Sequence, residues 1–84
     1  MSARVKLPQE LADLLRSELE TAIKEAALYR DDELIARRYI IEKWPQMDIA
    51  AELGWERSTV SHHIPYIFDE VCRAAKRITQ LTHN

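Results

Sequence analysis

The chain has one glycine and three prolines in 84 residues, and this scarcity of turn-forming residues limits the folds open to it. A sandwich or barrel of many strands needs a turn every ~8–12 residues, which so few glycines and prolines do not supply. Apolar side chains instead recur every three or four positions, and no run alternates apolar with polar residues. We therefore predict one all-α domain of four to five helices.

Composition removes several classes of protein. One cysteine is too few for a disulfide framework or a multi-cysteine zinc site. No apolar run approaches the ~18–20 residues of a membrane span, and MSARVKLPQ lacks the apolar centre of a signal peptide, so we expect a cytoplasmic protein without membrane contact. Twelve Lys and Arg against fourteen Asp and Glu give a net charge of −2, so any contact with nucleic acid must be a local patch.

The helical pattern places a single domain at 8–81, between tails at 1–7 and 82–84. Pro8 suits the first position of a helix, because a proline lacks the N–H that would be unpaired there. Asp31 is a suitable N-cap for the second helix, and Pro45 ends that helix. The predicted helices cover 8–29, 32–43, 46–53, 57–63 and a last segment that starts near Pro65.

Two details of these helices are open to direct test. The first helix carries an inward stripe formed by Leu11, Leu14, Leu15, Leu19, Ala22, Ile23 and Ala26. Pro65 would cost ~3 kcal/mol inside a continuous helix, so we expect a break or sharp kink between 57–63 and the last helix.

The segment 46–64 has the pattern of a helix-turn-helix. Two helices that cross at ~90–120° need a small residue where their backbones meet, which Ala50 supplies. The turn needs a positive φ, which Gly54 adopts at no steric cost. Apolar residues at fixed offsets then fill the angle between the two helices: Ile49, Leu53, Val60 and Ile64.

This segment, DIAAELGWERSTVSHHI, resembles the helix-turn-helix of sigma-70 region 4 and related small phage and bacterial transcription regulators. ARRYIIEKW, from Ala36 to Trp44, is similar to the helix that precedes the motif in that family. Two positions depart from the pattern: Glu56 stands where relatives cap the recognition helix with Ser or Thr, and His62–His63 stand where relatives often have Arg or Lys. The resemblance implies a transcription regulator that binds a specific sequence of double-stranded DNA.

A helix that enters the major groove reads base edges with its N-terminal, outward residues. Arg57 is the best candidate for guanine, because a guanidinium can bond both O6 and N7. His62 would add a cation facing phosphate at low pH. Backbone contacts from the preceding helix are the other candidates, and their alternative is a solvated helix face. The predicted DNA-binding residues are Arg57, Ser58, Thr59, Ser61, His62, Arg37, Arg38 and Lys43.

The remaining reactive side chains favour neither a metal site nor an enzyme. His62 and His63 point ~100° apart on a helix, so they do not form a chelating pair. Cys72 falls on an apolar helix face, where a buried hydrophobic role is expected. Trp44 and Trp55 flank the 46–53 helix and are expected to close the core. We find no nucleophile with its base, no carboxylate pair and no phosphate loop, and so expect no cofactor and no catalysis.

Three functions remain compatible with such a scaffold. A recognition helix of this length makes few contacts, so a DNA-binding regulator would act as a homodimer or by touching RNA polymerase. Small terminase-type subunits, which package viral DNA, also use a helix-turn-helix and assemble as rings. A protein-interaction module that has lost DNA binding is the third function, favoured by the acidic balance and Glu56.

Overall fold

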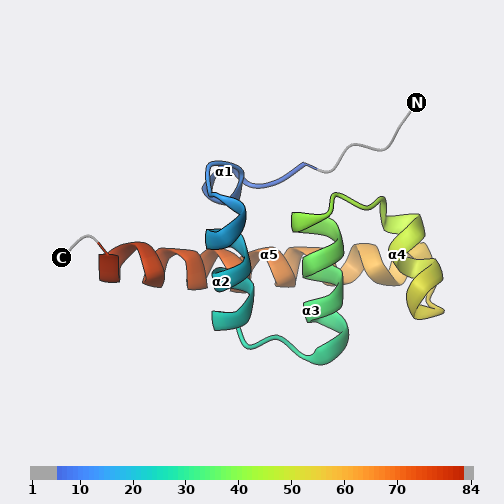
Figure 1. Ribbon diagram of the computed structural model, residues 1–84. Helices are drawn as coiled ribbons and strands as arrows, with labels where there is room; N and C mark the ends of the chain where they lie inside the picture. The colour runs from blue at the N-terminus through green and yellow to red at the C-terminus, as the bar shows by residue number, and fades with distance from the viewer. Residues whose placement is uncertain (1–5, 83–84) are drawn as a thin grey trace.

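The computed structural model describes residues 6–82, with side chains up to Thr79, and no strand occurs within that range. The chain forms five α-helices and one turn of π-helix (Figure 1). This confirms the predicted all-α fold of four to five helices. In chain order these are α1 (Gln9–Ala12), α2 (Arg16–Glu25), α3 (Arg30–Ala36), the π-helical η1 (Arg37–Ile41), α4 (Gln46–Leu53) and α5 (Arg57–Thr82).

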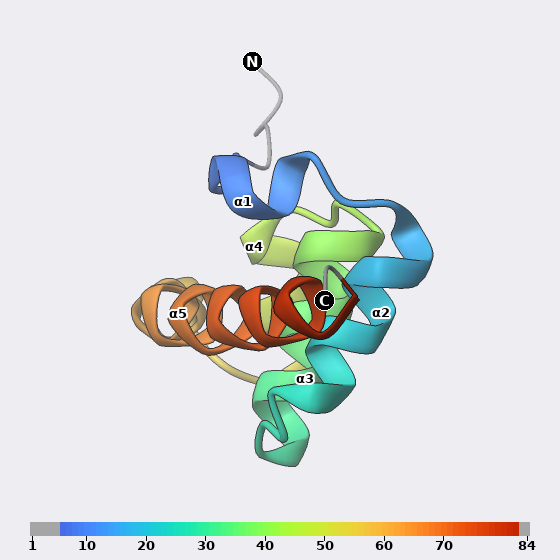
Figure 2. The same cartoon turned by 90° about the vertical axis from the view of Figure 1, so that its left-hand side faces the viewer.

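Helix α5 is the support on which the other helices pack. At ~1.5 Å per residue its 26 residues span ~39 Å, and Figure 1 shows it crossing behind α2, α3 and α4. Figure 2 shows α1, α2 and α3 gathered around one side of α5. The buried apolar core lies along that contact, and its members are Leu11, Leu19, Ala22, Ile23, Ile35, Ala36, Ile40, Ile49, Ala50, Val60, Ile64, Ile67, Val71, Ala74 and Ala75.

The predicted single helix over 8–29 is wrong, because the chain breaks after Ala12 and α2 ends at Glu25. Leu15 was expected to face inward, but it is the N-cap of α2 and its side chain is 68% exposed. Its N–H donates to Oε1 of Glu18 at 2.8 Å, which replaces the lost helical hydrogen bond. Leu11, in α1 before the break, is completely buried.

The second helix also differs from its predicted course. It begins at Arg30 with Tyr29 as N-cap, so Asp31 lies in the first turn and not at the cap. From Arg37 onward it widens into η1, where the N–H of Glu42 donates to the carbonyl of Arg37 at 3.1 Å. The segment ends at Lys43 in a left-handed conformation, with φ at 62°.

The predicted break at Pro65 is wrong, since α5 continues through it. Ile64 and Ile67 are buried on either side of Pro65, so both halves of the helix are held against the same core. Pro65 itself is exposed, and the carbonyl left without its helical partner is that of Ser61, which is also exposed. Packing of the apolar face therefore overrides the local cost of the proline.

The predicted boundaries of the domain need small changes. Leu7, placed in the N-terminal tail, is half-buried against the core. Thr82, placed in the C-terminal tail, is the last residue of α5. Lys6 is exposed, and 1–5 and 83–84 lie outside the described residues.

Candidate nucleic-acid interface

The turn between α4 and α5 has the geometry that the sequence predicted. Helix α4 ends at Leu53, and Gly54 follows with φ at 71°, in the left-handed region. The N–H of Trp55 donates to the carbonyl of Ala50 at 2.9 Å, and the N–H of Gly54 to that of Ala51 at 3.4 Å. This pair of hydrogen bonds is a Schellman motif, which ends one helix and redirects the chain.

The inside of the angle between α4 and α5 is apolar, as predicted. Ile49 and Val60 are completely buried, and Ala50 is 4% exposed. Ile64 is buried and Leu53 half-buried. Trp44 and Trp55 are half-buried and pack against this core, which confirms that they help to close it.

The opposite side of α5 at its start faces solvent. All five residues predicted on this helix are exposed: Arg57, Ser58, Thr59, Ser61 and His62. The guanidinium of Arg57 forms no hydrogen bond or ion pair within the described residues. The 57–68 segment also contains no Asp or Glu, although the chain has fourteen. The first three turns of α5 therefore present a face without acidic residues.

The N-terminal end of α5 has no side-chain cap. The carbonyl of Glu56 accepts the N–H of Thr59 at 3.0 Å and that of Val60 at 3.3 Å. Within the described residues, no side chain accepts a hydrogen bond from the N–H of Arg57 or Ser58. Free N–H groups at a helix start bind anions such as phosphate. The carboxylate of Glu56, directly before the helix, opposes an anion there.

Arg38 occupies a different position from the other candidates. Its Nε donates to Oε1 of Glu52 at 2.9 Å, its Nη2 to Oε2 of Glu52 at 3.1 Å, and its Nη1 to Oε2 of Glu42 at 2.8 Å. The guanidinium also lies 4.7 Å from the ring centre of Trp44. The hydrogen bond from Arg38 lowers the pKa of the Glu52 carboxyl. Arg38 was a candidate for a backbone contact with DNA, with a solvated helix face as the alternative, but it joins η1 to α4 and is not a free cation.

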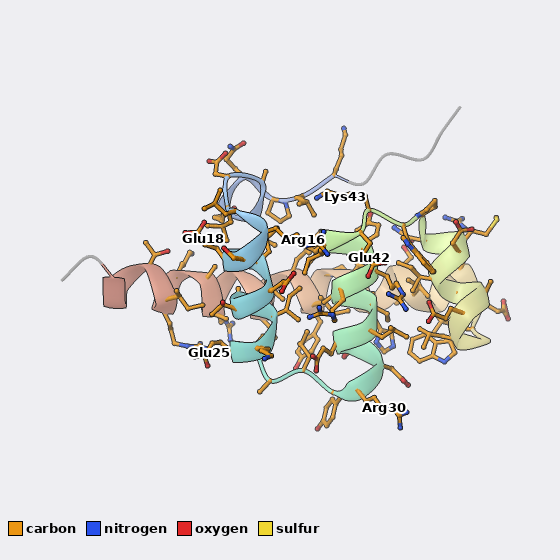
Figure 3. The ribbon with its side chains drawn as sticks, viewed as in Figure 1. Arg16, Glu18, Glu25, Arg30, Glu42 and Lys43 are labelled. Carbon is orange, nitrogen blue, oxygen red and sulfur yellow. The ribbon has the colours of Figure 1, made fainter. Side chains whose placement is uncertain are left out.

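Arg37 and Lys43 lie in two further settings. Arg37 is half-buried and does not lie on a fully solvated helix face, and it lines an open groove with Leu34 and Leu53. Figure 3 shows Lys43 at the end of η1 and Arg30 at the far end of α3. Nζ of Lys43 donates to the carbonyl of Ile40 at 2.8 Å and so caps the end of η1. The five α5 residues form one continuous face, and no described contact links Arg37 or Lys43 to it.

Tyr66 is a further candidate that the sequence prediction missed. It is 51% exposed and follows His62 by one helical turn, on the outward face of α5. The expected break at Pro65 placed Tyr66 on a separate helix. Its place could have been found from the apolar residues Val60, Ile64, Ile67 and Val71, whose helical spacing continues through the proline.

Three further findings concern a cysteine, metal ligands and membrane spans among the described residues. Burial raises the pKa of the Cys72 thiol, which makes it a poorer nucleophile. No group of three or more His, Cys, Asp or Glu residues is placed to hold a metal ion in the part that the structure describes. None of the described helices has the length and apolar character of a membrane span. Comparisons with family models, curated proteins and solved structures find no match to this chain.

Proposed function

We propose that this protein is a transcription regulator that binds duplex DNA by inserting the start of α5 into the major groove. One observation carries the proposal: a turn at the left-handed Gly54 presents a helix whose exposed first turns hold an unpaired arginine and no acidic residue. Such a helix fits the width of the major groove, and its N-terminal side chains meet the base edges first.

The exposed side chains divide into two groups by chemistry. Arg57 carries the fork of donors that matches O6 and N7 of guanine, so we assign it to base recognition. Ser58, Thr59 and Ser61 are short hydroxyl side chains, which allow the backbone near them to approach phosphates. His62 lies on the same exposed face, and we assign its imidazole to a phosphate contact.

The net charge of the protein bears on affinity. A net charge of −2 gives little general attraction to DNA, so a single copy would bind weakly. Two copies on paired half-sites, or a contact with RNA polymerase, would supply the missing affinity. The regulator is therefore proposed to act as a homodimer or beside the polymerase.

The test is selection from random duplex DNA, followed by affinity measurements on the enriched site across a range of salt. Arg57→Ala should cost ~1–3 kcal/mol on that site and relax the preference at one base pair. Arg73→Ala is the matched control, since Arg73 is an exposed arginine of the same helix sixteen residues further on. No enriched sequence together with no binding at low salt would exclude DNA binding.

One observation favours a second candidate, a protein-interaction module on the same scaffold. Glu56 places a carboxylate beside the open N-terminal end of α5, where it repels phosphate. If the random selection fails, the same acid-free face becomes the surface to examine for a protein partner. A ring-forming DNA-packaging subunit would differ from a dimer in its mass in solution.

A further inference from the structure

One charged side chain is buried among the described residues, and it belongs to none of the contacts assigned to DNA. This is Asp32 of α3, which is 6% exposed. Its Oδ1 lies 2.7 Å from Nδ1 of His63, in the second turn of α5. A carboxylate only accepts hydrogen bonds, so Nδ1 of His63 is the donor.

The imidazole of His63 joins three parts of the helix-turn-helix region. It sits on α5 directly before the buried Ile64, and it binds α3 through Asp32. Its ring centre is 4.9 Å from that of Trp55, at an angle of 47° between the rings. Trp55 follows Gly54 in the turn itself. One ring therefore contacts α3, the turn and α5 at once.

This hydrogen bond differs in kind from the apolar contacts around it. Val60 and Ile64 hold α5 in the core, but apolar packing is not directional and tolerates small rotations of a helix. A buried carboxylate is different, because rotation of α5 would take away the imidazole that donates to it. The Asp32–His63 pair therefore favours one orientation of α5 relative to α3.

We propose that Asp32 is a positioning residue for DNA recognition, which acts through His63 to fix the orientation of the first turns of α5 on α3. The inference rests on the proposed function, since orientation matters for the bases that Arg57 reaches. Asp32 itself touches no DNA in this scheme. Its removal should lower the discrimination between the selected site and random DNA more than it lowers binding to random DNA.

The experiment compares Asp32→Ala, His63→Ala and the double variant with Asp31→Ala, a control at the exposed neighbouring aspartate of α3. The ratio of affinities for selected and random DNA should fall about tenfold in each single variant, no further in the double variant, and not at all in the control. Asp32→Asn, which keeps an acceptor oxygen, should restore most of the ratio. Additive losses, or an unchanged ratio in folded Asp32→Ala, would overturn the proposal.

Two NMR measurements on the protein without DNA separate this proposal from the proposed function. Nitrogen chemical shifts of His63 should show a protonated Nδ1 that Asp32→Ala loses, and residual dipolar couplings should show α5 reoriented against α3. If the parent protein selects no DNA, the DNA-binding proposal fails while these data still decide whether Asp32 orients α5. If Asp32→Ala does not fold, two other measurements decide whether Asp32 orients α5. One is the nitrogen chemical shifts of His63 in the parent, and the other is the residual dipolar couplings of Asp32→Asn and His63→Gln. Unchanged couplings in His63→Gln would then contradict a positioning role.

Discussion

Arg38 and Glu52 form a two-point ion pair in which Nε and Nη2 of the guanidinium bind the two oxygens of one carboxylate, at 2.9 and 3.1 Å. The pair joins η1 to α4, across fourteen positions of sequence. Because the guanidinium fork matches the carboxylate at both oxygens, the contact fixes direction as well as distance. Helix α4 is therefore tied to the helix before it.

We expect Arg38→Ala to lower the melting temperature and to make α4 exchange its amide protons faster. Arg38→Lys should restore little, since an ammonium group cannot bind both carboxylate oxygens in this geometry. Arg16→Ala is the control, because Arg16 also pairs with a glutamate but is 73% exposed. Equal melting temperatures for the parent and Arg38→Ala would contradict the role of Arg38 as a link between η1 and α4.

The same pair predicts a pH dependence of stability. Arg38 lowers the pKa of Glu52 in the folded chain, so the folded state favours the ionised carboxylate. The contribution is present above the pKa of Glu52 in the unfolded chain, and it is lost as the pH falls through the lower folded value. Between about pH 5 and pH 3, the urea midpoint of the parent should fall more steeply than that of Glu52→Gln. Parallel curves would show that Glu52 carries no such linkage.

Gly54 and Ala27 form a natural pair for testing backbone strain, since both have a positive φ, at 71° and 52°. A Cβ on Gly54 would meet nothing within 4 Å, so a substitution there is penalised by the backbone alone. We expect Gly54→Ala to cost about 1–2 kcal/mol in the free energy of unfolding, and Gly54→Val more. Ala27→Gly should instead stabilise the fold by up to about 1 kcal/mol. Urea denaturation measures all three variants, and a loss of stability in Ala27→Gly would refute this account.

Pro65 allows a test of how the cost of a proline inside a helix compares with the packing of α5 in the core. Pro65→Ala restores the N–H that the carbonyl of Ser61 lacks, and a helix-interior proline costs ~3 kcal/mol. The gain will be smaller, because the alanine chain has more freedom when unfolded. We expect the free energy of unfolding to rise by about 1–2 kcal/mol, measured with urea. A decrease would mean that the proline suits this position of α5.

Glu56 can be used to strengthen the proposed interface. Glu56→Thr removes a carboxylate next to the open N–H groups of α5 and supplies a hydroxyl that caps them. Both stability and affinity for the selected DNA site should rise, the latter with a steeper dependence on salt. Glu70→Thr, a change at a half-buried glutamate further along the same helix, is the control for net charge. If both variants gained equal affinity and stability, the change in net charge would explain the gain, and the position of Glu56 beside the start of α5 would not.

Local rules predicted the parts of the fold that depend on neighbouring residues. The bounds of α4, the left-handed Gly54 and the buried Val60 follow from spacing and turn chemistry within a few residues. The course of α5 through Pro65 did not follow, because burial of Ile64 and Ile67 in a core built by distant segments decides it.

The polar contacts of the candidate site were beyond sequence reasoning for the same reason. Asp32 and His63 are thirty-one positions apart, and Arg38 and Glu52 fourteen. No periodicity in one helix indicates which distant side chain will meet it. The exposed face of α5 could be predicted because helical spacing alone shows which side of the helix is buried and which is exposed. The side-chain pairs that hold α5 in place depend on the tertiary fold.

Helix α5 runs without a break from Arg57 to Thr82, so a tilt at one point of the helix also moves its ends. Val71 is completely buried near the middle of α5, and Arg57 lies fourteen residues away, about 21 Å along the axis. A tilt of about 10° around Val71 would move Arg57 by about 4 Å, more than the reach of one hydrogen bond. A force applied to the C-terminal part of α5, on the other side of Val71, would therefore be felt at the guanidinium that is assigned to the base edge.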